Sequence, residues 1–203
     1  MRFTAHAALL LAAALLSSCA GYDRRLNDAR TSYLGTDGSI ISRTSQSTLA
    51  DKNSYWDGEG VAGPPFIVID LSEQTASFYR GGKLVGVSAI SSGREGFGTP
   101  TGNYKVTQKK PDHVSNLYGN YVNAQGDILV KNVGIKKDPK PPGAVFAGSP
   151  MPYFMRLNRT AVGLHQGFLP GVPDSHGCIR LPERMAKIFF ENAPIGTPVR
   201  IIN

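Results

Sequence analysis

The sequence predicts a mostly β domain, sandwich-like or barrel-like, with one helix near its C-terminal end and a disordered tether before it. From Pro64 onward, short apolar runs rich in β-branched residues alternate with turn residues, which is typical of such domains. One later run instead has apolar residues at helical spacing. Before Pro64, small polar residues dominate without a lasting period. Such a segment cannot bury enough apolar surface to offset its ordering entropy.

The N-terminal segment 1–18 is interpreted as a lipoprotein signal peptide. Arg2 supplies a positive charge, and the apolar run over residues 7–16 is too short to span a bilayer. It is followed by Leu-Ser-Ser-Cys, which resembles a lipobox, so lipidation is expected at Cys19. The alternative is an ordinary signal peptide cut nearby, with Cys19 incidental. Several acyl chains would hold the protein on a membrane, at ~0.8 kcal/mol per buried methylene.

A flexible tether is expected over residues 19–63, and the domain itself over residues 64–203. Pro64 and Pro65 mark the boundary between them. Within the tether, Tyr55 and Trp56 either dock on the domain or are partly ordered linker aromatics, and the sequence leaves both readings open.

Short strands with turns between them account for most of the domain. Residues 80–83 and 125–127 hold glycine between two apolar runs, which predicts hairpin turns. Residues 93–102 contain four glycines and are expected to form a loop. Residues 131–140 carry four lysines, and they are either a solvated loop or a mobile wall of a substrate cleft. The strands are expected at residues 66–71, 76–79, 84–91, 104–109, 121–122, 128–133 and 199–202, with a strand end at 161–164.

The one helix is expected to begin at Pro182 and to end near Asn192. Proline suits the first helical position, where its missing N–H removes no hydrogen bond. Apolar residues at helical spacing, Met185, Ile188 and Phe189, are expected to face the core.

Just upstream of this helix lies Cys178, the only cysteine besides Cys19. If Cys19 carries lipid, Cys178 stays a free thiol in an oxidising compartment, which favours a chemical role. A thiol needs a basic partner to act as a nucleophile, and His165 and His176 are at hand. The alternatives are a buried apolar thiol or a metal site built from these three residues. The ligand spacing is poor for zinc, so no metal and no cofactor are expected.

Four stretches together resemble the L,D-transpeptidases of bacterial cell walls, the YkuD-domain family. The resemblance covers residues 65–203. It rests most on an upstream histidine followed by Ser-His-Gly-Cys-Ile-Arg at 175–180. The other stretches are Ile-Val-Ile-Asp-Leu-Ser-Glu-Gln-Thr from residue 67 with the Gly-Gly-Lys turn after it, Gly-Thr-Pro-Thr-Gly-Asn-Tyr from residue 98, and Met-Pro-Tyr-Phe-Met from residue 151. Nine residues separate His165 from Ser175, fewer than in many family members, and this bears on substrate preference.

The resemblance implies a cysteine acyltransferase acting on peptidoglycan stem peptides. Cys178 would be the nucleophile and His165 would accept and donate the proton. Supporting or oxyanion-binding roles fall to Ser175, His176 and Gly177, with the backbone N–H groups around Gly177 and Cys178 as candidate donors.

In the implied reaction, the thiolate attacks the carbonyl of the third stem residue, a diamino acid, and expels the terminal D-alanine. An amine of another stem then resolves the thioester into a cross-link. Arg180 is suited to a stem carboxylate, because guanidinium and carboxylate pair bidentately.

Three alternatives to transpeptidation remain open. The same chemistry with water or a protein amine as acceptor gives an L,D-carboxypeptidase, another hydrolase or a lipoprotein-attaching enzyme. A non-catalytic peptidoglycan-binding lipoprotein would need neither His165 nor Cys178. A general cysteine protease is the weakest alternative, because its local signatures are absent.

The net charge of +7 suits anionic envelope polymers or acidic stems as partners. Nucleic acid is not expected, because no binding motif is present and export would remove access to it. The signal and Cys19 predict a lipid-anchored protein of the cell envelope, at the outer membrane facing the periplasm if the source is Gram-negative.

Overall fold

The computed structural model describes residues 33–34, 40–41, 51 and 53–203. The predicted signal peptide, the lipidation site at Cys19 and most of the tether lie outside the described residues. Strands β1 (Tyr33–Leu34) and β2 (Ile40–Ile41) form a short antiparallel pair. Among the described residues, no helix has the length and apolarity needed to cross a membrane.

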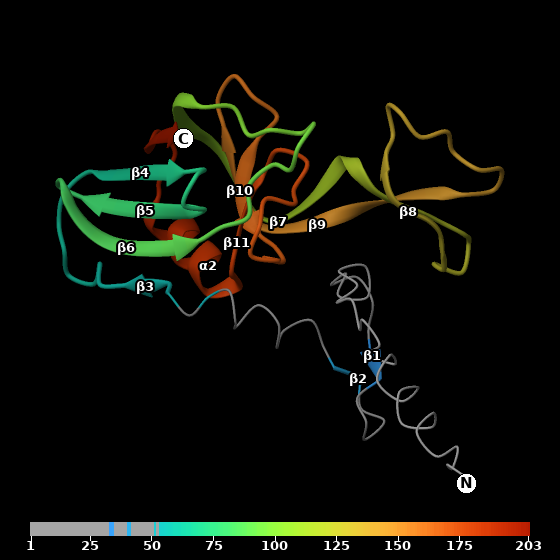
Figure 1. Ribbon diagram of the computed structural model, residues 1–203, viewed down its shortest axis with the longest axis horizontal. Helices are drawn as coiled ribbons and strands as arrows, with labels where there is room; N and C mark the ends of the chain where they lie inside the picture. Colours follow the sequence, from blue (N-terminus) through green and yellow to red (C-terminus); the bar gives the residue numbers. More distant parts are fainter. Residues whose placement is uncertain (1–32, 35–39, 42–50, 52) are drawn as a thin grey trace, which may run out of the picture.

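The domain is built on one ten-stranded sheet that curls toward closure (Figure 1). Along it the strands run in the order β11-β10-β9-β7-β12-β4-β5-β6-β3, and β8 pairs with β7 beside this path. After β6, Ser91 bridges to Arg180 of β11, and Gly93 bridges to Ser175. The chain leaving one side of the sheet thereby meets the strand at its other end. The predicted mostly β, barrel-like fold is confirmed.

The hairpins at the start of the domain agree with their predicted turns. Strands β4 (Pro65–Asp70), β5 (Thr75–Arg80) and β6 (Lys83–Ala89) pair antiparallel in sequence. Between β5 and β6, Gly81 and Gly82 have φ of 55° and 83°, which only glycine adopts without strain. The closing strand β12 (Pro198–Ile202) runs parallel to β4.

Residues at the end of the expected tether belong to the domain. Strand β3 (Tyr55–Trp56) pairs with β6, and the Trp56 ring packs edge-on against Phe78, with centroids 5.2 Å apart. Gly58 and Gly86 leave the room for this indole, because a Cβ on either would lie within 2.6 Å of it. The docked alternative for Trp56 is therefore the observed one, and the sheet includes residues that precede Pro64.

The helix α2 (Glu183–Asn192) covers the inner face of β9, β10 and β11. Its Met185 and Phe189 are fully buried, as the spacing predicts, while Ile188 is partly buried against the same core. Pro182 caps the helix rather than beginning it, and its carbonyl accepts from the Ala186 N–H.

Two long strands form an arm that extends beyond this core (Figure 1). Strand β7 (Gly102–Val122) has 21 residues and pairs with β9 (Val145–Leu157) along most of its length. The two strands expected at 104–109 and 121–122 are its two ends; the polar residues between them hide the continuity, and the pairing contains two register shifts. With β8 (Ile128–Gly134), the arm encloses a small core of its own, formed by Tyr121, Val133, Ala144 and Phe146.

Candidate active site

Two short neighbouring strands bring the predicted catalytic pair to one face of the sheet. Strand β10 (Gly163–Gln166) runs parallel to β11 (Ile179–Leu181), with Leu164 opposite Ile179 and His165 opposite Arg180. Leu164 and Ile179 are fully buried in the core. Because side chains alternate along a strand, His165 points to the opposite face, and Cys178, just before Ile179, points there too.

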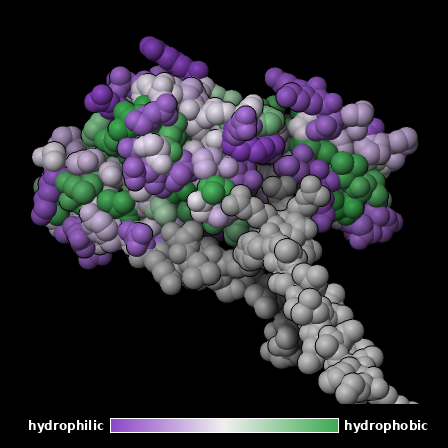
Figure 2. All heavy atoms as spheres, viewed as in Figure 1, coloured by the Kyte–Doolittle hydropathy of each residue, from purple (hydrophilic) through white to green (hydrophobic). Residues whose placement is uncertain are grey.

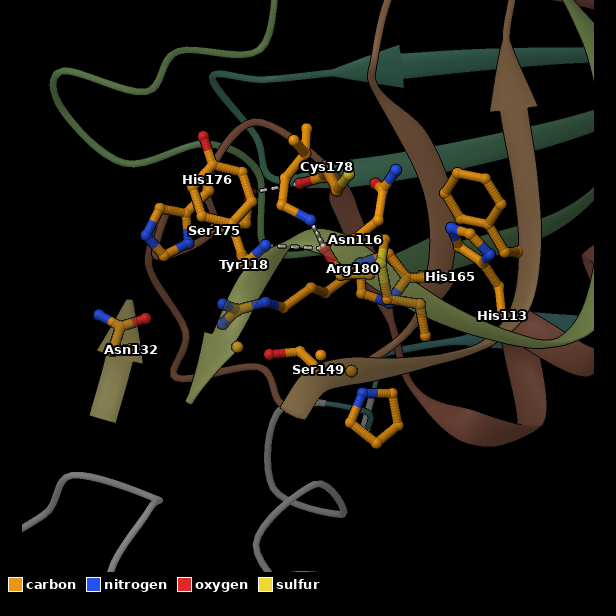
Figure 3. Close-up of a pocket in the computed structure, with 18 of the residues that line it drawn as sticks. His113, Asn116, Tyr118, Asn132, Ser149, His165, Ser175, His176, Cys178 and Arg180 are labelled. Carbon is orange, nitrogen blue, oxygen red and sulfur yellow. Dashed lines mark hydrogen bonds between the residues drawn. The ribbon is translucent and has the colours of Figure 1, made fainter. Parts of the chain in front are cut away.

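Cys178 and His165 both line a pocket of about 500 Å³ that lies between this face and the arm (Figure 3). The pocket also takes residues from β7, β8 and β9. From the lysine-rich segment 131–140, Lys131 lines the pocket and Lys137 lies 5.1 Å from the centre of the Phe97 ring. That segment thus borders the pocket, which agrees with the cleft-wall alternative.

His165 is held in one orientation and one tautomer. Its Nδ1 lies 2.7 Å from the Gln166 carbonyl oxygen, and a carbonyl can only accept, so Nδ1 donates and Nε2 keeps the lone pair. The side chain is 7% exposed. The pKa of His165 is lowered to about 4, chiefly because burial disfavours the imidazolium; the Gln166 carbonyl opposes this shift, and the charges of Arg180 and His113 add to it.

Cys178 is a free thiol whose environment keeps it protonated at rest. Burial raises the pKa of Cys178, while a hydrogen bond from the Gly163 backbone and the charges of Arg156 and Arg180 oppose the rise. With the pKa of His165 near 4, the pair is a neutral thiol beside a neutral imidazole at neutral pH. Such a pair suits general-base activation, in which the thiol loses its proton as it attacks.

Ser175 fastens the turn that presents the thiol. Its hydroxyl donates to the Cys178 carbonyl and accepts from the Gly177 N–H, the latter at 3.0 Å. Gly177 has φ of 108°, where any other residue would be strained. The Gly177 N–H is therefore already bonded, which leaves the Cys178 N–H as the better of the two predicted oxyanion donors.

The glycine-rich loop 93–102 holds the same turn through a second pair of hydrogen bonds. The Thr99 hydroxyl donates to the Gly177 carbonyl at 2.8 Å and accepts from the Gly93 N–H at 2.9 Å. A Cβ on Gly93 would lie 2.0 Å from the Phe97 carbonyl oxygen, so this close approach requires glycine. The sequence marked this segment as a loop but gave no sign that it supports the cysteine.

His176 occupies an aromatic cluster beside the turn (Figure 3). Its ring stacks on Tyr118, with centroids 4.2 Å apart, and meets the edge of Phe97 at 4.8 Å. The Arg94 guanidinium lies 2.9 Å from its Nε2. Arginine can only donate, so Nε2 accepts and is not available as a base. His176 thus connects the cysteine turn to the arm, which suits a supporting role.

Replacing His176 with alanine should therefore have a moderate effect. We expect the rate of Cys178 alkylation by iodoacetamide to fall less than about 10-fold, because the base is intact and only the positioning of the turn is weakened. The rate should be measured against pH with circular dichroism as the folding control. A loss of 100-fold or more in a folded variant would mean that His176 takes part in proton transfer.

Arg180 has a partner within the chain. Its Nη1 pairs with Asp174 Oδ2 at 2.8 Å, and its Nη2 lies 3.3 Å from the Asp174 carbonyl oxygen. Gly167 lies against the side chain, where a Cβ would come within 3.0 Å of three of its carbons. The guanidinium thus fastens the short loop between His165 and Ser175. A substrate carboxylate at Arg180 would have to compete with Asp174, so the predicted binding role has no support from this geometry and stays a prediction.

Several pocket residues escaped the sequence reasoning. His113 on β7 stacks on Phe154 at 4.3 Å, and Phe154 lies 6.5 Å from the His165 ring. Arg156 and Tyr118 also line the pocket. These residues sit on β7 and β9, whose pairing is not visible in the sequence. The described residues include no cluster of His, Cys, Asp or Glu side chains suited to a metal ion.

The comparisons with known proteins agree with this arrangement. The model of the YkuD family, the L,D-transpeptidase catalytic domain, matches residues 64–201. The chain therefore belongs to the YkuD family of L,D-transpeptidase catalytic domains, and the resemblance seen in the sequence is confirmed. A search of curated proteins found no match.

Three solved structures illustrate the likeness. An L,D-transpeptidase from Mycobacterium smegmatis is 19% identical with a TM-score of 0.52, over 69% of this chain and 59% of that one. One from Stackebrandtia nassauensis is 20% identical with a TM-score of 0.50, over 69% and 56%. A mutant L,D-transpeptidase from Enterococcus faecium is 26% identical with a TM-score of 0.50, over 70% and 50%. The chain thus spans between 50% and 59% of the length of these proteins.

Proposed function

We propose that this protein is a peptidoglycan L,D-transpeptidase that works through a thioester on Cys178. The observation that supports this most is the placement of Cys178 and His165 on one face of two adjacent parallel strands, in one pocket. A thiol with a neutral base of fixed tautomer suits acyl transfer, because covalent catalysis divides one difficult step into two easier ones. Family membership supports peptidoglycan stems as the substrate.

In the proposed first step, His165 Nε2 takes the thiol proton while the sulfur attacks the carbonyl carbon of the third stem residue. The Cys178 N–H is the candidate donor to the oxyanion, and such donors contribute ~3–4 kcal/mol to the transition state. The imidazolium then gives its proton to the departing D-alanine nitrogen. In the second step, the side-chain amine of another stem attacks the thioester and gives a proton to His165. The amide bond of the cross-link forms as the carbon–sulfur bond breaks, and His165 returns the proton to the sulfur, which restores the free thiol.

Export and lipid anchoring at Cys19 remain part of the proposal. The apolar segment and the lipobox-like residues support them, and a tether after the lipid would let the domain reach the wall. Metabolic labelling with a radiolabelled fatty acid, followed by gel electrophoresis, tests the anchor when the native protein is compared with a Cys19→Ala variant. Loss of label in the variant is the expected result, and equal labelling of both proteins would contradict the anchor.

Muropeptide analysis separates transpeptidation from its closest alternative. Purified protein incubated with tetrapeptide-containing muropeptides should yield cross-linked dimers that mass spectrometry detects. Tripeptides alone, without dimers, would indicate an L,D-carboxypeptidase, since water would then be the acceptor. Unchanged muropeptides despite measurable binding would favour the non-catalytic alternative.

A further inference from the structure

The cation best placed to receive a substrate carboxylate is Arg156, which the sequence did not single out. It lies on β9 and lines the same pocket as Cys178. Its Nε donates to Gln108 Oε1 at 2.9 Å, and its guanidinium carbon lies 5.0 Å from the centre of the Phe154 ring. Within the described part of the chain, Arg180–Asp174 is an ion pair but no carboxylate pairs with Arg156.

Strand register brings Arg156 into line with the nucleophile. Arg156 lies opposite Gln108 on β7 and opposite Gly163 on β10. Gly163 in turn lies beside Cys178, because the next residues, Leu164 and Ile179, are partners. Neighbouring strands are about 4.8 Å apart, so the Arg156 and Cys178 backbones are separated by roughly two strand spacings, about 10 Å.

The residue between them in this row has no side chain. A Cβ on Gly163 would lie 2.4 Å from the Phe154 ring, so the ring covers this glycine as an apolar surface. Arg156 lies over the same ring, and a guanidinium stacked on an aromatic face and bonded at Nε is preorganised. The terminal nitrogens remain to receive a carboxylate bidentately.

The influence of this guanidinium reaches the thiol. Among the charges that oppose the raised pKa of Cys178, the charge of Arg156 has a larger effect than that of Arg180. Arg180, in contrast, is paired with Asp174 at 2.8 Å.

We propose that Arg156 binds the terminal carboxylate of the donor stem, the carboxylate that leaves with the last residue. This inference rests on the proposed function and adds a substrate-binding residue to it. With the scissile carbonyl at the sulfur, the terminal carboxylate lies about one residue, ~3.5 Å, farther along the peptide. Arg156 lines the same pocket as the sulfur, and the separation of about 10 Å between their backbones leaves room for this last residue. The donor stem must then end one residue after the scissile carbonyl, so Arg156 favours tetrapeptides as donors.

Charge-selective alkylation tests this placement without any peptidoglycan. Iodoacetate and iodoacetamide both form a thioether on Cys178 and release iodide, but only iodoacetate carries a carboxylate. Arg156→Gln should lower the ratio of the iodoacetate rate to the iodoacetamide rate about 10-fold or more, since a charge-assisted hydrogen bond is lost. Arg156→Lys should lower it less.

Two further variants are the matched controls. Arg184→Gln removes a cation of α2 that donates to the Ser54 carbonyl, away from the pocket, and it should leave the ratio unchanged. Arg180→Gln should lower it less than Arg156→Gln does. A ratio unchanged in Arg156→Gln, or lowered more by Arg180→Gln, would overturn the inference.

The binding of stem peptides to the Cys178→Ala protein tests whether Arg156 recognises the substrate carboxylate. Calorimetry should show a tetrapeptide stem binding at least ~10-fold more tightly than its C-terminal amide, and Arg156→Gln should abolish this preference. A preference that survives in Arg156→Gln overturns the inference, even if muropeptide dimers support the proposed function. An Arg156-dependent preference in a protein that forms no dimers or tripeptides upholds the inference and contradicts the proposed function.

Discussion

Replacing Cys178 with serine is expected to abolish both the acyl-enzyme and the cross-linked product. The site raises the pKa even of a thiol, because burial disfavours the anion. A hydroxyl in the same place is far harder to ionise, and removing the nucleophile from a catalytic pair typically costs on the order of 10⁴-fold or more. Intact-protein mass spectrometry after incubation with a tetrapeptide stem should show the thioester adduct only in the native protein.

Serine is close to cysteine in size, so this variant should fold. Circular dichroism provides the check, and Arg184→Gln serves as a variant that leaves the pocket intact. Its adduct should form at the native rate. A Cys178→Ser protein that keeps more than a tenth of the native cross-linking rate would show that Cys178 is not the nucleophile.

How far the sequence predicts this fold depends on the range of each signal. The β5–β6 hairpin and α2 follow from local chemistry, namely Gly81 and Gly82 in a turn and Met185 and Phe189 at helical spacing. The arm follows from pairing between β7 and β9, whose partners are about 40 residues apart, as with His113 and Met151. No local pattern encodes such a pairing, so the polar sequence of β7 predicts only two short strands, one at each of its ends.

The candidate site shows the same division. The sequence predicts Cys178 and His165 as the catalytic pair because rare, reactive side chains occur there in a family pattern, and the fold places both in one pocket. The role of each neighbour depends on what it contacts in the fold. Arg180 is chemically suited to a carboxylate, but the fold gives it Asp174 at 2.8 Å. Arg156 had no signal in the sequence, and only the row of β7, β9 and β10 places it near the thiol.

The identity of the base leads to the second large effect. His165→Gln should lower the rate of acyl-enzyme formation ~10²–10⁴-fold, the usual contribution of a positioned base. Glutamine can still donate to the Gln166 carbonyl that now holds Nδ1 at 2.7 Å, but it cannot accept the thiol proton. Iodoacetamide alkylation should become slow at neutral pH and recover only at alkaline pH, where the thiol ionises without help. Native-like alkylation at neutral pH would exclude His165 as the base.

The pH profile gives this prediction a signature that a structural role would not produce. His165 must be neutral to accept a proton, so kcat/KM should fall as the pH drops through about 4, instead of near the ~6.5 of an ordinary histidine. The free energy of unfolding changes over a wider pH range than the activity does. Because the folded pKa lies below the unfolded one, the unfolded chain takes up the extra proton, and stability is lost as the pH falls from ~6.5 toward 4, by roughly 3 kcal/mol.

Urea unfolding at pH 7 and at pH 4.5 separates the two effects. The native protein should lose stability between these values, and His165→Gln, which has no titrating group there, should lose less. The fall of kcat/KM at low pH should then be measured at pH values where circular dichroism shows that the native protein remains folded. A fall of kcat/KM near pH 6.5 in folded protein would mean that His165 is more accessible to solvent than its 7% exposure implies. It would also contradict the neutral resting state of Cys178 and His165.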